Sequence, residues 1–257
     1  MRVLAVGDVV GVSACEFLRR RLPGLRRELG IDLCIVNGEN AAKGNGVTQE
    51  SCESIFDAGA DVITTGNHVF QKREVYDYLD DTPMVVRPCN LYPAAPGHGW
   101  TTLDVGAARV LVVNLMGRVY LEAYENPFAA MDKLLREQGA QADVVIVDFH
   151  AEATSEKIAM AHHLDGRAAL LFGTHTHVPT ADECIFPGGL GYITDVGMTG
   201  PIWSVIGVDS KNVLLKFTTQ LPQRFEACKN PVRMQAIVAE IDEKMGKTTK
   251  IERLILE

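Results

Sequence analysis

The sequence opens with MRVLAVGDVVGV (residues 1–12), in which the run RVLAV (2–6) is followed at once by Gly7 and Asp8. A short, valine-rich apolar run that ends at a glycine is typical of a buried β-strand. Within 13–29 the leucines recur at helical spacing, so we expect a helix there. The N-terminus therefore predicts a strand, a polar turn and a helix, which is the first part of a βαβ unit.

The same alternation continues along the chain. DLCIVN (32–37) precedes the helix-like TQESCESIFDAG (48–59), and DVITT (61–65) precedes REVYDYL (73–79). Strands that alternate with helices in this way predict an α/β protein with parallel strand pairs.

The pattern changes from Met84 onward. MVVRP, WTTLDV and ARVLVVNLM are expected to form adjacent strands around the Pro/Gly-rich loop CNLYPAAPGHG. NPFAAMDKLLREQG (126–139) predicts a helix, with Asn126 as its N-cap, Pro127 at the first helical position and Gly139 at its end.

Two further buried strands are expected at ADVVIVDFH (142–150) and RAALLFG (167–173), with the helical segment TSEKIAMAHHL between them. The last third is Gly-rich and β-like from CIFPGGLGYITDVGMTGP until QAIVAEIDEKMG (235–246). Because no internal repeat or low-complexity tract interrupts the chain, we expect a single domain over residues 1–257.

Composition excludes several classes of protein. The chain has 257 residues, 47% hydrophobic and 23% charged, which is ordinary for a soluble globular protein. Its net charge is −8, and no basic cluster is denser than Arg19–Arg21 or Arg26–Arg27, so binding along duplex nucleic acid is not expected. No stretch approaches the ~20 apolar residues of a membrane span, so no membrane partner is expected.

Cysteine usage indicates the compartment. The six cysteines include no C-x-x-C pair, which argues against a zinc knuckle and against a disulfide framework. The N-terminal apolar run is short, is broken by Asp8 and lacks a small-residue cleavage site, unlike a signal peptide. We therefore expect a cytoplasmic protein.

Polar residues follow the expected strands, where they end. Their common position is the carboxyl end of a strand, the edge at which sites assemble in α/β sheets. These residues are Asp8, Glu39, Asn40, Asn67, His68, His150, His175 and His177. Each has an ordinary structural role open to it, as a helix cap, a turn residue or a buried histidine. Their repeated occurrence at strand ends, however, predicts one shared site.

The residue types indicate a metal site. Carboxylates, amide oxygens and imidazoles without a thiolate suit Mn, Fe, Co or Zn rather than Ca or an iron–sulfur cluster. On an extended segment, residues i and i+2 point the same way, so His175 and His177 are expected to face one pocket and to ligate two neighbouring ions. Two ions ~3.5–4 Å apart generate hydroxide near neutral pH and orient a phosphate. The sequence thus predicts phosphoester hydrolysis, with Asn67 as a ligand and His68 as the general acid.

The same residues resemble a known motif series. GD (7–8), NGEN (37–40), GNH (66–68), His150 and GTHTH (173–177) are similar to the motifs of calcineurin-like metallophosphoesterases. The longer stretches VNGENAAKGNG, TTGNHVFQK, DFHAEATSEK, GTHTHVPTAD and ITDVGMTGPIWSVIG resemble the bacterial YmdB-like subfamily, whose members are binuclear-metal cyclic-nucleotide phosphodiesterases. The resemblance spans almost the whole chain.

The resemblance implies the site and its ions. Where the superfamily has Asp-x-His, this chain has Asp8-Val9-Val10, and the usual bridging Asp is Glu39; both departures are shared by YmdB-like proteins. One ion would be held by Asp8, Glu39, Asn40 and His177, and the other by Glu39, Asn67, His150 and His175. A hydroxide bridging the ions would attack phosphorus, and His68 would donate the proton. The oxygen-rich first site favours Fe or Mn over Zn.

The resemblance also implies a four-layer α/β/β/α sandwich of two mixed sheets flanked by helices. The implied substrates are small-molecule phosphoesters, 2′,3′-cyclic nucleotides such as 2′,3′-cyclic AMP first among them, and the implied assembly is a dimer or tetramer. No residue pattern identifies a pocket for the base. The loop aromatics are expected to serve packing more than stacking on a base. They are Tyr92, Trp100, Tyr120, Tyr124 and Phe128. Asp195, in TDVGMTGP, also matches the family.

Other interpretations stay open at this point. The same metal pair would support a phosphomonoesterase or protein phosphatase. A regulatory protein could bind a nucleotide without turnover, although a purely structural metal site needs no open coordination position. A mononuclear hydrolase could use His150, His175 and His177 alone, which would leave Asp8 and Glu39 unexplained.

Overall fold

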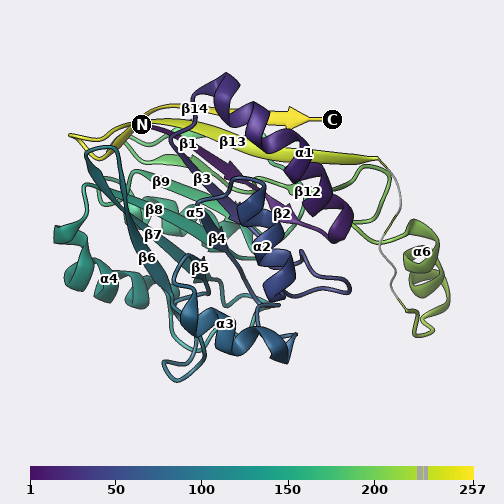
Figure 1. Cartoon of the computed structure of the whole chain (residues 1–257). Coiled ribbons are helices and arrows are strands. Elements are labelled where there is room, and N and C mark those ends of the chain that lie inside the picture. The colour runs from purple at the N-terminus through teal and green to yellow at the C-terminus, as the bar shows by residue number, and fades with distance from the viewer. Residues whose placement is uncertain (225–227, 229–230) are drawn as a thin grey trace.

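The computed structural model describes residues 1–224, 228 and 231–257 (Figure 1). The described strands form two sheets. The first has the order β2-β12-β13-β1-β3-β4-β5, with β14 also paired to β13, and the second has the order β10-β11-β9-β8-β7-β6. Both sheets are mixed, because β1 is parallel to β3 but antiparallel to β13, and β7 is parallel to β8 but antiparallel to β6.

The bounds of the described elements are as follows. The strands of the first sheet are β1 (Arg2–Val6), β2 (Asp8–Val9), β3 (Leu33–Asn37), β4 (Val62–Thr64), β5 (Val85–Val86), β12 (Met198–Pro201), β13 (Val232–Asp242) and β14 (Lys247–Leu256). Those of the second are β6 (Trp100–Val105), β7 (Ala108–Met116), β8 (Val144–His150), β9 (Leu170–Thr174), β10 (Cys184–Ile185) and β11 (Gly191–Ile193). The helices are α1 (Val12–Leu29), α2 (Gln49–Asp57), α3 (Tyr76–Asp81), α4 (Pro127–Gln138), α5 (Thr154–Leu164) and α6 (Ser210–Thr219). Two short 3-10 helices, η1 (Arg73–Val75) and η2 (Gly139–Gln141), adjoin α3 and α4.

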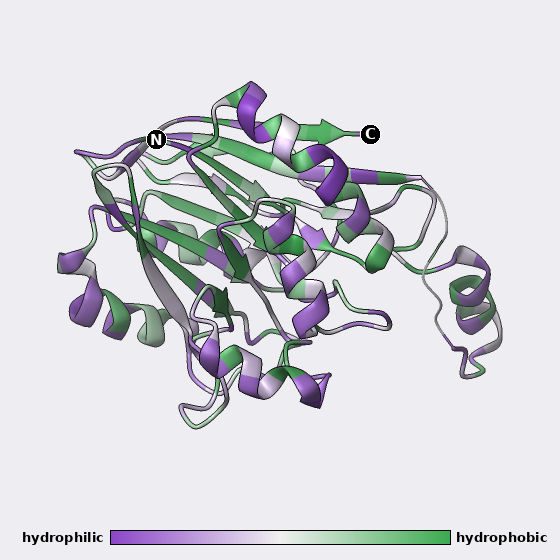
Figure 2. Ribbon diagram, viewed as in Figure 1, coloured by the Kyte–Doolittle hydropathy of each residue, from purple (hydrophilic) through white to green (hydrophobic). Residues whose placement is uncertain are grey.

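Three apolar cores separate four layers. In β1, Leu4 and Val6 pack toward α1 and α2, whereas Val3 and Ala5 pack between the sheets, because alternate residues of a strand face opposite sides. A third core lies between the second sheet and helices α4 and α5. Figure 2 shows the strands as mainly hydrophobic and the helices as two-sided. The structure thus confirms the expected four-layer arrangement of two mixed sheets and flanking helices.

Most elements lie where the sequence predicts them. Helix α5 spans the predicted TSEKIAMAHHL segment. Helix α4 has the predicted ends, with the Asn126 side chain accepting hydrogen bonds from the backbone N–H groups of Phe128 and Ala129, Pro127 in its first turn and Gly139 at its C-cap.

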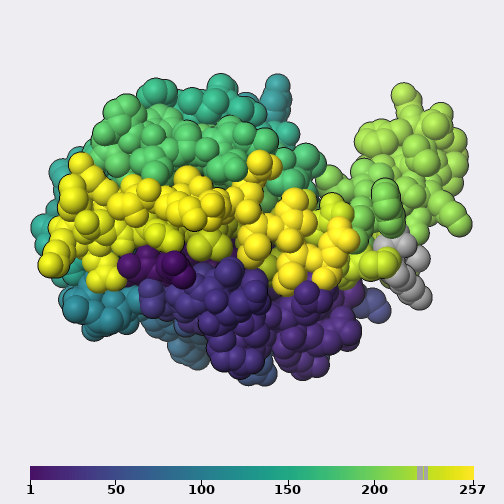
Figure 3. Space-filling model, turned by 90° about the horizontal axis from the view of Figure 1, so that it is seen from above, coloured from purple at the N-terminus to yellow at the C-terminus, as the bar shows by residue number. Residues whose placement is uncertain are grey.

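The C-terminal third differs from the prediction in two places. The β-like character does not end at 235–246, because Gln235–Asp242 belongs to β13, which pairs with β1 on one side and with β14 on the other. Helix α6 lies in a region that we expected to be β-like. It projects away from the layered body in Figures 1 and 3 and contributes little to the packed layers. The hydrophobic pattern of the sequence predicts mainly elements that pack in those layers.

The strand pairing brings the predicted site residues to one edge. Strands β1, β3 and β4 run parallel, and so do β7, β8 and β9, with His150 of β8 opposite Thr174 of β9. The carboxyl ends of parallel strands lie at a common edge, where the loops that follow them meet. Within the described part of the chain, none of the helices has the length and apolar character that crossing a bilayer requires.

Candidate metal centre

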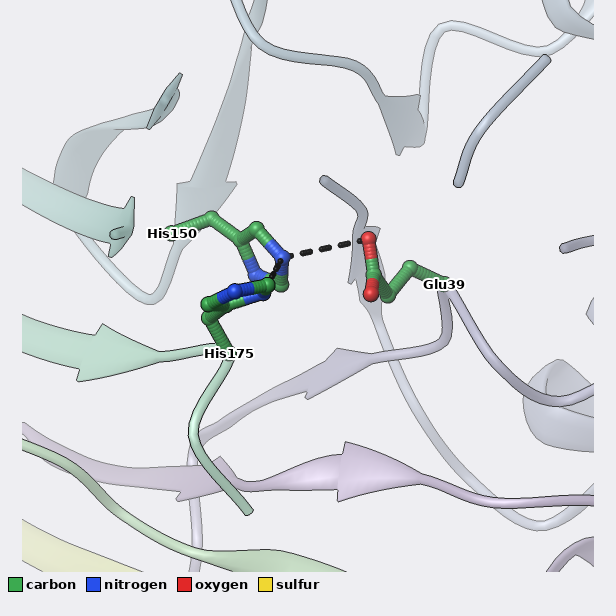
Figure 4. Close-up of side chains that lie close together, drawn as sticks. All are labelled: Glu39, His150 and His175. Carbon is green, nitrogen blue, oxygen red and sulfur yellow. Dashed lines mark hydrogen bonds and ion pairs between the residues drawn. The ribbon is translucent and has the colours of Figure 1, made fainter. Parts of the chain in front are cut away.

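Three predicted ligands meet at the centre of this edge (Figure 4). Glu39 follows β3, His150 ends β8 and His175 follows β9. The His150 Nε2 atom lies 3.2 Å from Glu39 Oε2 and 3.0 Å from His175 Nδ1. One ligand atom from each of the three side chains lies within 4.8 Å of the others, which is the spacing of groups that hold a metal ion. The Asn67 Oδ1 atom joins this group, 3.0 Å from His150 Nε2.

A second group of donors adjoins the first. The Nε2 atom of His177 lies 3.7 Å from Asp8 Oδ1 and 3.3 Å from Asn40 Nδ2. Asn40 in turn donates from Nδ2 to Glu39 Oε1 at 2.9 Å, so Glu39 lies between the two groups. The structure therefore brings together all seven residues that the sequence analysis singled out as ligands, from segments as far apart as 8 and 177.

The Asp8 carboxylate fits a cation. Its side chain is fully buried, and Oδ1 has no hydrogen-bond partner, although Oδ2 accepts from the His175 backbone N–H. Burial raises the pKa of Asp8, opposed by the nearby His177 and His150. A buried carboxylate oxygen without a partner costs free energy that a bound cation removes, and the oxygen and nitrogen donors around it suit a transition metal ion.

Each imidazole is fixed from its outer side. His150 Nδ1 lies 2.9 Å from the Thr174 hydroxyl, and His177 Nδ1 lies 3.0 Å from the Ile206 carbonyl oxygen. His175 Nε2 lies 3.1 Å from a carboxylate oxygen of Glu152. With the outer nitrogen donating its proton, the inner nitrogen turns its lone pair to the centre, which is how histidine ligands of metals are usually oriented.

A buried polar network supports His150. Asp148 is fully buried on β8 and accepts hydrogen bonds from Thr64, from Asn37 and from the Thr174 hydroxyl that faces His150. Burial raises the pKa of Asp148 to about 6, against the lowering effect of His150 and these donors. The network links β3, β4, β8 and β9, so it fixes the position of the ring relative to both sheets.

The loop that carries the two other histidines is held by a buried ion pair. Lys157 of α5 donates to the Thr174 carbonyl at 2.8 Å and to Asp195 Oδ2 at 2.7 Å, and both charged side chains are 1% exposed. The same Asp195 oxygen accepts from the Thr176 backbone N–H at 3.2 Å. These contacts surround the sharp turn between the two histidines.

The histidines converge for a different reason from the one expected. His175 and His177 have φ values of 99° and 63°, which lie in the left-handed region and not in the extended region. The prediction that both rings lie at one site is confirmed, but the extended geometry on which it rested is wrong. A turn of this kind is strained for non-glycine residues, and such strain is typical of functional sites.

His68 lies beside the centre rather than within it. Its Nδ1 atom lies 2.9 Å from Asn40 Oδ1 and 3.1 Å from Glu39 Oε1, and its side chain is 25% exposed. The backbone N–H of His68 donates to Glu39 Oε2 at 3.2 Å. Because Nδ1 faces these oxygens, Nε2 is the atom left to meet a bound substrate.

Electrostatics favour an ionised Glu39. Burial alone would raise the pKa of Glu39, but His150 and His68 hold it well below the usual value. For His150, burial lowers the pKa, but Glu39, Asp8 and Asp148 together raise it to about 9. Burial and the neighbouring His150 lower the pKa of His175 to about 3. Glu39 is therefore anionic at neutral pH, as a carboxylate ligand of a cation must be.

Sequence reasoning missed the residues that position the ligands. Asp148 gave a weak signal, because it is a charged residue inside the otherwise apolar run ADVVIVDFH. Lys157 gave none, since a lysine in a helix is ordinary on a solvent-facing side. Of the loop aromatics, Tyr92 and Tyr124 stack on each other with ring centroids 3.7 Å apart, and Phe128 contacts His163. For these three, the expectation of packing is confirmed.

Comparison with known proteins places the chain in a family. A model described as YmdB-like protein matches residues 4–254. The 2′,3′-cyclic-nucleotide 2′-phosphodiesterase of Bacillus subtilis (strain 168) is 42% identical over 256 residues, which are 100% of this chain and 97% of that protein.

Solved structures agree over the same length. A hypothetical protein from Thermus thermophilus has a TM-score of 0.94 at 42% identity, and the match covers 100% of this chain and 99% of that one. A structure described as a novel phosphatase from Mycoplasma pneumoniae has a TM-score of 0.93 at 34% identity, with 100% and 93% covered. Because the match extends over nearly the full chain in sequence and in fold, the protein belongs to the YmdB-like family.

Proposed function

We propose that the protein is a metal-dependent phosphodiesterase that hydrolyses 2′,3′-cyclic nucleotides at this centre. The observation that carries the proposal is the convergence of seven residues with oxygen and nitrogen donors, among them a fully buried Asp8 carboxylate with an unpartnered oxygen. The substrate class is suggested by the Bacillus subtilis relative, whose name states a 2′,3′-cyclic-nucleotide 2′-phosphodiesterase.

The two groups of donors support a pair of ions. We assign Asp8, Glu39, Asn40 and His177 to one ion, and Glu39, Asn67, His150 and His175 to the other, because Glu39 has one oxygen near Asn40 and the other near His150. The first set holds one imidazole against two carboxylates and an amide, which favours Fe or Mn, with Zn the lesser candidate. When bound, such ions supply positive charge for a phosphate group and acidify water near neutral pH.

The chain itself supplies orientation and a proton. The Asn40 amide holds the His68 ring by its Nδ1 atom, so that Nε2 can donate a proton to the ribose oxygen that leaves phosphorus. Replacement of His68 by Ala should lower the rate on 2′,3′-cyclic AMP about 10²- to 10⁴-fold while the metal content stays the same. An unchanged rate would rule out this role for His68.

The decisive experiment measures metal content and substrate preference together. Purified protein with Mn²⁺ should hydrolyse 2′,3′-cyclic AMP, and mass spectrometry should find two ions per chain. The variant Glu39→Gln should lose metal from both positions, whereas Glu28→Gln, on the exposed face of α1, should keep it. If Glu39→Gln retained both ions, the bridging assignment would be wrong.

The alternative activities give different outcomes. The name of the Mycoplasma pneumoniae structure favours a phosphatase as the second candidate, and a phosphomonoester turned over faster than a diester would support it. Nucleotide binding without turnover at full metal content would support a regulatory protein. One ion per chain would support the mononuclear site of His150, His175 and His177.

We also propose a cytoplasmic homo-oligomer, a dimer or a tetramer. Cys15, Cys34, Cys52, Cys89 and Cys184 form no disulfide, which suits a reducing compartment. Helix α6 and its flanks expose large apolar side chains, among them Leu214 (60%), Phe217 (75%) and Leu221 (60%), and exposed apolar patches mark interaction surfaces. The variant Phe217→Glu should lower the mass measured by light scattering, whereas an unchanged mass would exclude this helix from the interface.

A further inference from the structure

A cavity of about 410 Å³ lies beside the candidate metal centre. Its lining includes Gly66, Asn67 and Phe70 from the segment after β4, and Met116, Tyr120 and Leu121 from the end of β7 and the segment after it. Its volume falls within the ~300–1,000 Å³ of small-molecule sites. Among the described residues that line it there is no lysine or arginine, so the cavity does not suit a second phosphate group.

The cavity and the centre share a wall. Asn67 lines the cavity and also places its Oδ1 atom 3.0 Å from His150 Nε2. Gly66 is pressed against the centre so closely that a Cβ atom there would lie 2.3 Å from Glu39 Oε2 and 2.3 Å from His150 Nε2. A ligand with its phosphate at the centre can therefore extend the rest of its structure into this cavity.

A loop, residues 117–124, supplies part of the lining, and hydrogen bonds hold both of its ends. Asn90 is fully buried, and its side chain donates to the carbonyl oxygens of Met116 at 2.8 Å and Glu125 at 3.1 Å, while accepting from the Met116 backbone N–H at 2.9 Å. One side chain thus joins the two ends of the loop. Gly117 also donates to the His150 carbonyl at 2.9 Å, which ties the loop to a proposed ligand.

Two aromatic side chains, Phe70 and Tyr120, are part of the lining of the cavity. Phe70 packs edge-on against Tyr76 with ring centroids 5.6 Å apart, and the Tyr76 hydroxyl donates to the Phe70 carbonyl, so the Phe70 ring is held in place. Tyr120 is 90% exposed and has a φ of 63°, in the left-handed region. Backbone strain of this kind in a non-glycine residue is typical of functional sites and ligand clamps.

We infer that this cavity binds the base of the nucleotide whose phosphate lies at the metal centre, with Tyr120 and Leu121 covering one face of the ring. The inference rests on the proposed function for the placement of the phosphate. A flat heterocycle matches the chemistry of the walls, which combine aromatic rings, aliphatic side chains and the thioether of Met116. Base stacking of this kind tolerates different bases, because every base has a π-face.

The first test separates the base from the phosphate. In Tyr120→Ala and Leu121→Ala, the KM for 2′,3′-cyclic AMP should rise about tenfold, with kcat within about twofold. The kinetics of methyl riboside 2,3-cyclic phosphate, which has the same cyclic diester but no base, should not change. The control is Val119→Ala, an exposed residue of the same loop whose side chain does not line the cavity. Equal loss on both substrates would overturn the inference.

The second test does not depend on turnover. Adenosine, which lacks a phosphate, should show saturation-transfer NMR signals with the wild type and with Glu39→Gln, and these signals should be lost in Tyr120→Ala. Adenosine binding that survives in both cavity variants, or no binding to the wild type, would overturn the inference. If binding depends on the cavity but no phosphodiester is hydrolysed, the proposed function fails and base binding stands.

Discussion

At the scale of single residues, the buried pair of Lys157 and Asp195 supports the turn that carries two of the proposed ligands. Both side chains are 1% exposed, and their charges meet at 2.7 Å next to the turn that carries His175 and His177. A buried pair adds little stability compared with apolar residues of the same volume, but the removal of one partner leaves an uncompensated buried charge. The pair is therefore expected to matter most when it is broken.

The variant Lys157→Met should destabilise the protein by about 3–5 kcal/mol, because Asp195 would stay buried without its partner. The free energy of unfolding in urea is the measurement. Lys133→Met, an exposed residue of α4, should change it by less than about 0.5 kcal/mol. The double variant Lys157→Met with Asp195→Asn should recover part of the loss. If Lys157→Met were as stable as the wild type, the Asp195 carboxylate would not be buried in solution and the prediction would be wrong.

The sequence predicts the candidate metal ligands, but it does not predict the residues that hold them in position. Asp8, Glu39 and His150 each adjoin a strand that is visible as an apolar run, so position and residue type together identify them. Lys157 and Asn90 act through partners far along the chain, Asp195 and Glu125, and no local pattern reports such a contact. Their roles depend on tertiary structure alone.

At the scale of elements, the local sequence around α4 predicts the ends of that helix. Asn126 satisfies two N–H groups of the first turn of α4, at 2.9 Å and 3.3 Å, and its residue type alone predicted this role. Asn126→Ala should lower the free energy of unfolding by about 1 kcal/mol, because these donors lose their partner. Asn126→Asp keeps an acceptor oxygen and should stay near the wild type in the same urea titration. If Asn126→Ala and Asn126→Asp had equal free energies of unfolding, water would satisfy these N–H groups as well as the side chain does, and the prediction would be wrong.

The β13 hairpin shows where local sequence fails. The order of alanine, glutamate and isoleucine in Gln235–Asp242 does not predict a strand that continues the β-like region before it. In the structure, β13 pairs with β1, with β12 and with β14, so it is a central strand of the first sheet. Pairing on both sides outweighs local propensity, and only the fold reveals it.

At the scale of the whole molecule, four layers place buried thiols in the two outer cores. Cys15, Cys34 and Cys52 lie in the core beneath α1 and α2, and Cys89 packs against the core on the side of α4 and α5. Burial raises the pKa of Cys15 to about 11, and that of Cys34, Cys52 and Cys89 to about 12. Buried thiols of this kind stay neutral in the folded protein at pH values where an exposed thiol ionises.

These raised pKa values predict instability in alkaline solution. Below about pH 8.5, the thiols are neutral in both states and have no effect, whereas above it only the unfolded chain releases their protons. Stability should therefore fall with rising pH toward 11–12, by up to about 1.4 kcal/mol per pH unit for each thiol.

The variant Cys34→Ala tests this prediction. In reductant between pH 9 and 10.5, its free energy of unfolding should fall less steeply with pH than that of the wild type, by about the same amount per pH unit. Lost packing in this variant lowers stability at every pH and leaves the slope unaffected, so the two effects separate. The exposed Cys184, replaced by Ala, should change the slope much less, and equal slopes for Cys34→Ala and the wild type would show that the core admits the thiolate.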